Sequence, residues 1–321
     1  MIGKRGGLLV FLYMIFLVVL FLMCSTDLII REPKKKVYQI SVIVEDDRDD
    51  NYSNFKKGME QAAVELHADV RFITLYERLD AGQQMELLNR EEQDGADILI
   101  VAPVSGERVA DALSDRRVSV PVVLLGTKVR EEKAAGMVTV DEWKMGEQLA
   151  GQMLQKMPPD CPVLVLAESD GPGAENGDFL KGAMGVLRNG GHRCRTAVPD
   201  KESGCAALLE EYSGEHVFAL AGSADILTQA AEALSDDSSL EVHAGGLYGR
   251  GSTLPILNAL DQGWITGICV ADEFSRGYFS VQRAVQFLEG DDGGPVVLDS
   301  YYIEKEDLRK PEYEKILFPI E

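Results

Sequence analysis

Apolar residues recur along the chain in two alternating patterns. Short runs rich in β-branched residues, the first at 37–44, predict strands that are covered on both faces. Stretches in which apolar residues return every three or four positions, such as Phe55, Met59 and Ala63, predict helices. The expected strands are 37–44, 69–77, 96–104, 120–126, 136–141, 163–167, 192–198, 217–221, 240–247, 265–270 and 296–303. Strands that alternate with helices in this way predict right-handed βαβ crossovers and parallel sheets.

The alternation divides into two arrays of similar length at Pro158, Pro159 and Pro162. We therefore expect an α/β fold of two doubly wound, Rossmann-like lobes that face a cleft. Ligands of open α/β sheets bind beyond the carboxyl ends of the strands, so the loops at that edge are the candidate site. Lobe pairs of this kind close around ligands by hinge motion.

The first residues follow a different pattern, because Leu8 to Cys24 is an uncharged apolar run. An uncleaved membrane anchor needs only this length and is the favoured interpretation. A lipoprotein would be modified at Cys24, but Met23 is large where such sites prefer a small residue. A cleaved signal peptide would need a small-residue cleavage site, and none of the usual type is present. We assign 1–36 to this segment and a charged tether.

Composition narrows the class of protein further. The 321 residues carry a formal net charge of -21, which argues against nucleic acid as a partner. The five cysteines form no CxxC pair and do not cluster with histidines, so a zinc site is not expected. Cys194 and Cys205 either pair or remain two buried thiols.

No strong catalytic motif is present, whether a phosphate-binding loop, GxGxxG, GxSxG or HExxH. We expect no enzyme activity, no catalytic residue, no metal and no cofactor. The acidic loop 45–50 resembles a calcium loop only superficially, since no glycine turn follows it, and we interpret most of its side chains as a solvated rim. An enzyme of this fold would have Glu168, Asp170 and Glu175 as acid–base groups, but no nucleophile stands near them in the sequence.

Aromatic residues stand at three loops of the predicted ligand edge, namely Tyr52, Trp143 and Tyr248. Aromatic faces beside carboxylates and amides suit sugars, which offer hydroxyls for hydrogen bonds and C–H faces for stacking. The alternative for each ring is a lid on the local core.

Several segments resemble type I periplasmic binding proteins, the fold shared with LacI-type sugar-binding domains and ribose-binding proteins. They are DNYSNFKKGMEQAA at 50–63, DILIVAPV at 97–104, VPVVLLG at 120–126, VTVDEWKMGEQLA at 138–150 and AGGLYG at 244–249. The resemblance implies a three-strand hinge and a location outside the cytoplasm. It also implies one lobe at 37–141 with 271–292, a second at 142–270 with 293–306, and a C-terminal tail at 307–321.

The resemblance also implies a set of ligand-binding positions in this sequence. Tyr52 would stack on the ligand, Tyr248 would line the second lobe, and Asp272 would lie near the hinge. Asp49, Asn51 and Asn176 would bond to ligand hydroxyls. Further candidates at places where sugar binders of this type often carry other polar residues are Thr127, Lys128 and Ser223. Glu175, beside Asn176, is a candidate as well.

These features predict an extracytoplasmic solute-binding protein. It would capture a small polar ligand, a sugar, between two lobes and deliver it to a membrane permease of an ABC-type transporter. The alternative is a membrane-anchored sensor of the same fold that signals to a histidine kinase or another receptor.

Overall fold

The computed structural model describes residues 4–25, 36–47, 49–126, 134–168, 177–200, 204–212, 217–236, 244–291 and 293–319. The chain divides into two units, Met1–Val37 and Tyr38–Glu321. In the first unit, α1 (Lys4–Ser25) contains Gly6–Met23, 18 residues of mean hydropathy 2.8. This helix is long and apolar enough to cross a membrane, and a signal sequence meets the same criterion, so the interpretation of 1–36 stays a prediction.

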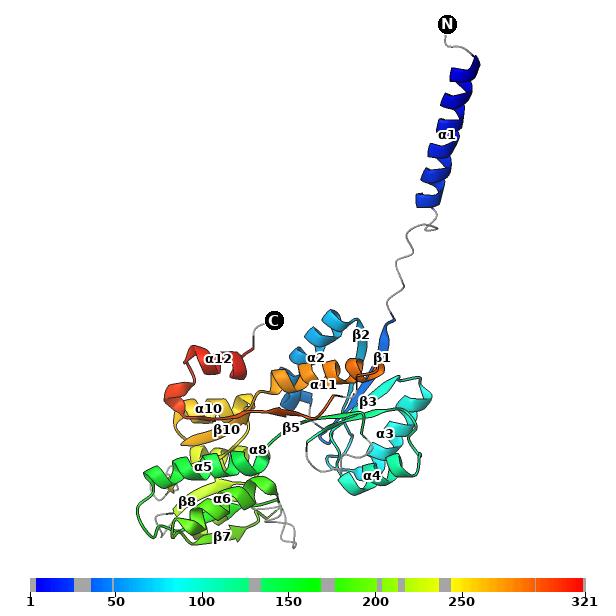
Figure 1. Ribbon diagram of the computed structural model, residues 1–321. Helices are drawn as coiled ribbons and strands as arrows, with labels where there is room; N and C mark the ends of the chain where they lie inside the picture. Colours follow the sequence, from blue (N-terminus) through cyan, green and yellow to red (C-terminus); the bar gives the residue numbers. More distant parts are fainter. Residues whose placement is uncertain are drawn as a thin grey trace. The chain divides into compact units, whose positions relative to one another are not determined.

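The first of two sheets in the second unit is six-stranded and parallel (Figure 1). Its strand order is β11-β5-β4-β3-β1-β2. The strands are β1 (Tyr38–Ile43), β2 (Ala68–Ile73), β3 (Ile98–Val101), β4 (Val122–Leu125), β5 (Gly136–Val140) and β11 (Val296–Leu298). The helices that pack on this sheet are α2 (Ser53–Leu66), α3 (Ala81–Gln93), α4 (Gly106–Ser114) and α11 (Glu273–Leu288), and we call this assembly lobe one.

The second sheet repeats the arrangement in the order β12-β10-β9-β8-β6-β7. Its strands are β6 (Val163–Leu166), β7 (Cys194–Ala197), β8 (Val217–Ala221), β9 (Ala244–Arg250), β10 (Gly267–Ala271) and β12 (Ser300–Ile303), and β12 alone is antiparallel to its neighbour. Its helices are α5 (Glu142–Lys156), α6 (Asp178–Asn189), α7 (Gly204–Glu211), α8 (Ala224–Asp236) and α10 (Leu254–Gln262). This assembly is lobe two.

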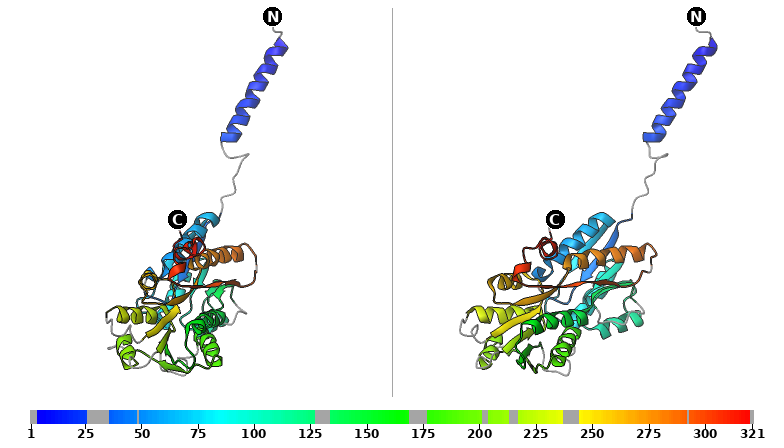
Figure 2. Two further views of the ribbon diagram at one scale, coloured as in Figure 1. Left: turned by 90° about the vertical axis from the view of Figure 1, so that its left-hand side faces the viewer. Right: turned by 60° about the vertical axis from the view of Figure 1, so that its left-hand side comes forward.

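Helices cover both faces of each sheet, which is the reason for the continuous apolar strands (Figure 2). On one face of lobe one, Val42 and Ile100 pack against α2 and α11. On the other face, Ile43 and Leu99 pack against α3 and α4. The predicted α/β fold of two doubly wound parallel-sheet lobes is therefore confirmed.

The chain passes between the lobes at three short segments, which form the expected hinge. These are 140–142 between β5 and α5, 271–273 between β10 and α11, and 298–300 between β11 and β12. The last crossing differs from our expectation, which placed one strand at 296–303 in lobe two. Val296–Leu298 pairs with β5 in lobe one, and only Ser300–Ile303 joins lobe two, because the extended chain changes sheets at Asp299.

Each lobe contains one helix crossing at which backbones touch through glycine. In lobe one, a Cβ added to Gly58 of α2 would come within 2.8 Å of the carbonyl carbon of Phe274. A Cβ added to Gly277 of α11 would come within 2.8 Å of the carbonyl carbon of Phe55. In lobe two, the same reciprocal contact joins Gly146 of α5 and Gly182 of α6. Both crossings therefore require a residue without a side chain on each helix.

The C-terminal segment is more than the charged tail expected from the sequence. It contains a 3-10 turn (Lys305–Asp307) and the helix α12 (Pro311–Leu317), and Leu308 and Leu317 are buried in the core of lobe two. It also reaches lobe one, where Asn54 of α2 donates a hydrogen bond to the carbonyl of Leu317 at 2.9 Å.

Candidate functional site

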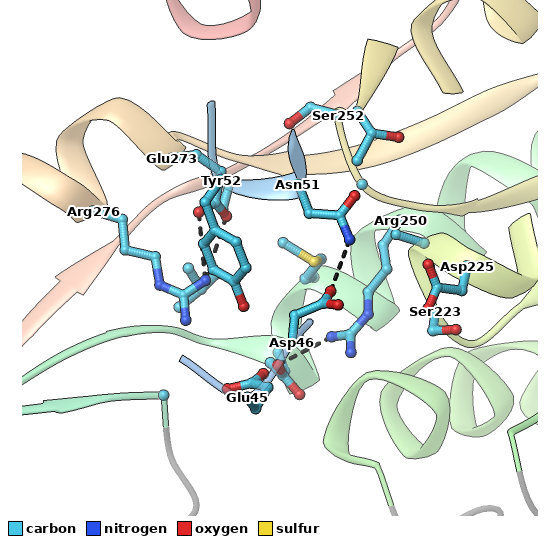
Figure 3. A pocket seen from close by; sticks show the side chains of 18 of the residues that line it. Glu45, Asp46, Asn51, Tyr52, Ser223, Asp225, Arg250, Ser252, Glu273 and Arg276 are labelled. Atoms are coloured by element: carbon cyan, nitrogen blue, oxygen red, sulfur yellow. Dashed lines mark hydrogen bonds and ion pairs between the residues drawn. The ribbon is translucent and has the colours of Figure 1, made fainter. Parts of the chain in front are cut away.

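A cavity of about 330 Å³ lies between the two lobes. Residues from both sheets line it, and nearly all of them follow the carboxyl ends of strands (Figure 3). From lobe one come Glu45, Asp46, Asn51, Tyr52, Arg78, Leu79, Gly126, Glu273 and Arg276. From lobe two come Glu142, Met145, Glu168, Ser223, Ala224, Asp225, Arg250, Gly251, Ser252, Thr253 and Cys269. Thr139, Val140 and Ala271 lie at the hinge. This is the edge at which doubly wound sheets bind ligands.

The loop after β1 presents Asp46 and Asn51 to the cavity. Asp46 is buried, and its carboxylate accepts a hydrogen bond from the Asn51 amide at 2.7 Å (Figure 3). This bond leaves the carbonyl oxygen of Asn51 as an acceptor for another group. The short 3-10 helix (Asp49–Tyr52) then leads into α2.

The ring of Tyr52 forms the apolar part of the lobe-one wall. It packs on Phe72 with centroids 5.4 Å apart and meets Phe55 edge-on at 6.1 Å. Burial and the neighbouring Glu45 raise the pKa of Tyr52 above its ordinary value. The phenol therefore stays protonated and is a donor at neutral pH.

Two guanidiniums in the cavity pair with carboxylates of their own lobe. Arg276 lies 3.5 Å from Glu273 on the same helix. Burial lowers the pKa of Arg276, but Glu273 and Glu45 outweigh it, so the pKa lies above the ordinary value. Arg250 lies 3.0 Å from Glu142, and its guanidinium covers the ring of Phe179 at 5.1 Å.

The third guanidinium, Arg78, pairs with carboxylates of both lobes. Its shortest ion pair is to Asp225 at 2.8 Å, followed by Glu168 at 3.3 Å and Asp46 at 4.0 Å. Partial burial lowers the pKa of Arg78, but Asp225 and Glu168 outweigh it and raise the pKa overall.

The structure brings three of the predicted site residues to the cavity, namely Asn51, Tyr52 and Ser223. The side chain of Asp49 and all of Thr127, Lys128, Glu175 and Asn176 lie outside the described residues. Asp272 stands at the hinge, where its carboxylate caps α11 by accepting hydrogen bonds from Ser275. It is not among the lining residues.

Tyr248 does not line the cavity, which corrects our expectation. The sequence pattern predicts a strand at 240–247 with Tyr248 in the loop after it, but β9 runs from Ala244 to Arg250 and contains Tyr248 in its interior. Its side chain is fully buried, stacks on Phe218 and belongs to the core under α5 and α6. The ring is thus the core lid that was the alternative for each loop aromatic.

Most of the charged residues that line the cavity carry almost no signal in the sequence. Arg78, Arg250 and Arg276 belong to no motif, and their only signal is that each falls within a few residues of the end of a strand.

Within the described residues, no group of three His, Cys, Asp or Glu is arranged to hold a metal ion. Cys194 and Cys205 do not form a disulfide; Cys205 is buried and Cys194 is partly exposed.

Two parallel-sheet lobes, three hinge segments and a polar cavity between them define a bilobal binding protein. Residues 40–292 match the family described as "Periplasmic binding protein domain", so the chain belongs to this family. This description indicates a binding domain that works outside the cytoplasm. A comparison with curated proteins finds no significant match.

Solved structures share the fold at low sequence identity. One is a carbohydrate transporter solute-binding protein from Agrobacterium radiobacter in complex with D-arabinose, with TM-score 0.75, 16% identity, and coverage of 88% of this chain and 100% of that chain. Another is an ABC transporter solute-binding protein from Bacillus halodurans with bound myo-inositol, with TM-score 0.72, 19% identity, and coverage of 86% and 97%. A third is the complex of the TorS sensor domain with TorT, with TM-score 0.73, 17% identity, and coverage of 88% and 98%.

Proposed function

We propose that this protein captures a small polyhydroxylated ligand, a sugar or cyclitol, in the cavity between its lobes and delivers it to an ABC-type permease. The observation that carries the proposal is the cavity itself, which polar side chains from both lobes line at the carboxyl ends of the strands. Its volume of about 330 Å³ lies within the usual range for small-molecule sites.

The groups that line the cavity support a ligand rich in hydroxyls. Asp46 and Asn51 offer acceptors beside the Tyr52 ring, and Ser223 offers a hydroxyl from lobe two. Carboxylates and amides on both walls with one aromatic face match the donors, acceptors and C–H faces of a sugar. The carbohydrates bound by proteins of the same fold point to the same ligand class.

Location follows from the family and from the first unit of the chain. The binding domain works outside the cytoplasm, and we propose that α1 remains as an anchor that keeps it at the membrane surface. Anchoring raises the local concentration of the domain near a permease in the same membrane.

The test measures ligand binding to residues 36–321, which contain the whole second unit, by the shift in melting temperature and by calorimetry. The panel is D-arabinose, D-tagatose, D-allose and myo-inositol, with amino acids and nucleosides as other classes. A ligand that binds only the native state adds about 2.7 kcal/mol at a hundredfold excess over Kd. We expect a shift with a carbohydrate that is lost in Asn51→Ala, which removes the amide beside Asp46, and kept in Asn89→Ala, whose amide bonds to Met85 within α3.

A sensor role is the second candidate, favoured by the likeness to a chain of the complex between the TorS sensor domain and TorT. In that case the closed domain would present its surface to a membrane receptor instead of a permease. Binding of a solute together with co-purification of a histidine kinase from the native membrane would support it. No thermal shift with any member of the panel would contradict the sugar proposal.

A further inference from the structure

Arg78 joins the two lobes at the cavity. It lies on the segment between β2 and α3 in lobe one, whereas Glu168 follows β6 and Asp225 opens α8 in lobe two. Among the described guanidiniums that line the cavity, it is the one that pairs across the lobes, because Arg250 and Arg276 pair within their own. Rotation about the hinge segments must therefore separate Arg78 from its two partners in lobe two.

The segment that presents Arg78 is held firmly to lobe one. The backbone amide of Leu75 donates to the Asp46 carbonyl at 3.0 Å, and the amide of Leu79 donates to the Glu45 carbonyl at 3.0 Å. Asp80 then caps α3 through the amides of Gly82 and Gln83. The guanidinium thus projects from a backbone that is fixed on both sides of it.

Leu79, the residue after Arg78, has a φ of 61° and lies in the left-handed region. This conformation is costly for a residue with a Cβ, and such strain is concentrated at functional sites. Here it turns the chain at the second backbone anchor, directly after Arg78.

We infer that Arg78 is an electrostatic latch that favours the closed arrangement of the lobes. Asp46 holds the guanidinium from its own lobe, while Asp225 and Glu168 draw it toward lobe two. The latch stabilises the closed state even without a ligand, so it raises the fraction of closed molecules. A ligand that binds the closed state raises this fraction further. This inference goes beyond the proposed function, because it concerns the lobes and holds for any ligand class.

The test measures the radius of gyration of residues 36–321 by small-angle X-ray scattering without added solute. This unit is compact and contains all four apolar cores. In Arg78→Gln we expect a larger radius and a ratio of open to closed molecules raised about threefold to tenfold, the effect of losing a partly exposed ion-pair network. Arg78→Lys keeps the charge, so its radius of gyration is expected to lie between those of wild type and Arg78→Gln.

Salt and a partner variant provide independent checks. At about 1 M salt the screening length is about 3 Å, so the wild-type radius of gyration should approach that of Arg78→Gln. The radius of Arg78→Gln itself should change little with salt. Asp225→Asn should open the lobes as well, and the double variant should open them less than the two single effects combined.

The matched control is Arg117→Gln. Arg117 pairs with Asp115 at 3.3 Å within lobe one, and both side chains are exposed. Its loss should leave the radius unchanged. Equal radii for wild type, Arg78→Gln and Asp225→Asn at low salt, with melting temperatures that show all three folded, would overturn the latch.

Discussion

The glycine crossing of α2 and α11 gives the sharpest prediction for the stability of this protein. In Gly58→Ala the new methyl group would lie 2.8 Å from the carbonyl carbon of Phe274 and 3.0 Å from the amide nitrogen of Tyr278. The carbonyl oxygen of Phe274 would lie closer still, and ordinary contacts begin at about 3.4 Å. The helices must therefore separate by clearly more than the ~0.6 Å that the carbonyl carbon alone would require, at a crossing that helps to build the core of lobe one. Because the obstructing atoms are backbone, no side chain can move aside to relieve the overlap.

The expected loss in unfolding free energy is about 1–3 kcal/mol. Overpacking costs about this much, and near the top of the range when backbone must shift. The better helix propensity of alanine returns at most about 1 kcal/mol. Gly58→Ala with Gly277→Ala should cost less than the two single losses together, since the first substitution already separates the helices.

Urea unfolding of residues 36–321 measures these differences, and Gly151→Ala is the matched control. Gly151 lies in α5, where an added Cβ meets nothing within 4 Å, so alanine should raise the unfolding free energy by up to about 1 kcal/mol. Our account of the crossing would be refuted if Gly58→Ala were as stable as wild type while Gly151→Ala gained stability as expected.

Three further predictions concern residues away from this crossing. Leu317→Ala in α12 should cost about 2–5 kcal/mol in urea unfolding, because the side chain is buried, whereas Phe318→Ala at the exposed neighbour should change it by under about 0.5 kcal/mol. Tyr248→Phe should leave the unfolding free energy unchanged or raise it by about 1 kcal/mol, because the buried hydroxyl has no hydrogen-bond partner among the described residues, and it should leave ligand affinity unchanged in calorimetry. Burial raises the pKa of Cys269 from 9.0 to about 12, so its contribution to stability is complete below about pH 9 and is lost as pH rises toward 12. Cys269→Ala should therefore lose less unfolding free energy than wild type between about pH 8 and about pH 10.

The fold was largely predictable from the sequence because the central strands of both sheets are covered on both faces. Runs such as 98–101, ILIV, are buried at every position and are recognisable as strands from their continuous apolar sequence. The predictions that were wrong concern strand pairing, because the pattern of apolar residues does not show which strand or sheet a segment joins. Val296 to Ile303 reads as one strand, and nothing in its pattern marks the change of sheet at Asp299.

The site was predictable in position but not in composition. A loop at the carboxyl end of a strand is recognisable, so Asn51, Tyr52 and Ser223 were expected at the cavity. Three residues of error at the end of β9 were enough to place Tyr248 in a loop, although it faces the core. The partners of Arg78 lie 90 and 147 positions further along the chain, as the residue numbers of Glu168 and Asp225 show, and no local pattern encodes such a contact.

The two glycine crossings also determine how the cavity can change shape. Of the helices in these pairs, α5 and α11 begin directly at hinge segments, and they bring Glu142, Glu273 and Arg276 to the cavity. Backbone contact at the glycines holds α5 against α6 and α11 against α2, so these helices cannot slide past each other within a lobe. Closure must then be a rigid rotation at 140–142, 271–273 and 298–300, with the walls of the cavity moving as blocks. A substitution at a crossing should therefore change stability and ligand affinity together, whereas the loss of Arg78 should change the open fraction and leave each lobe intact.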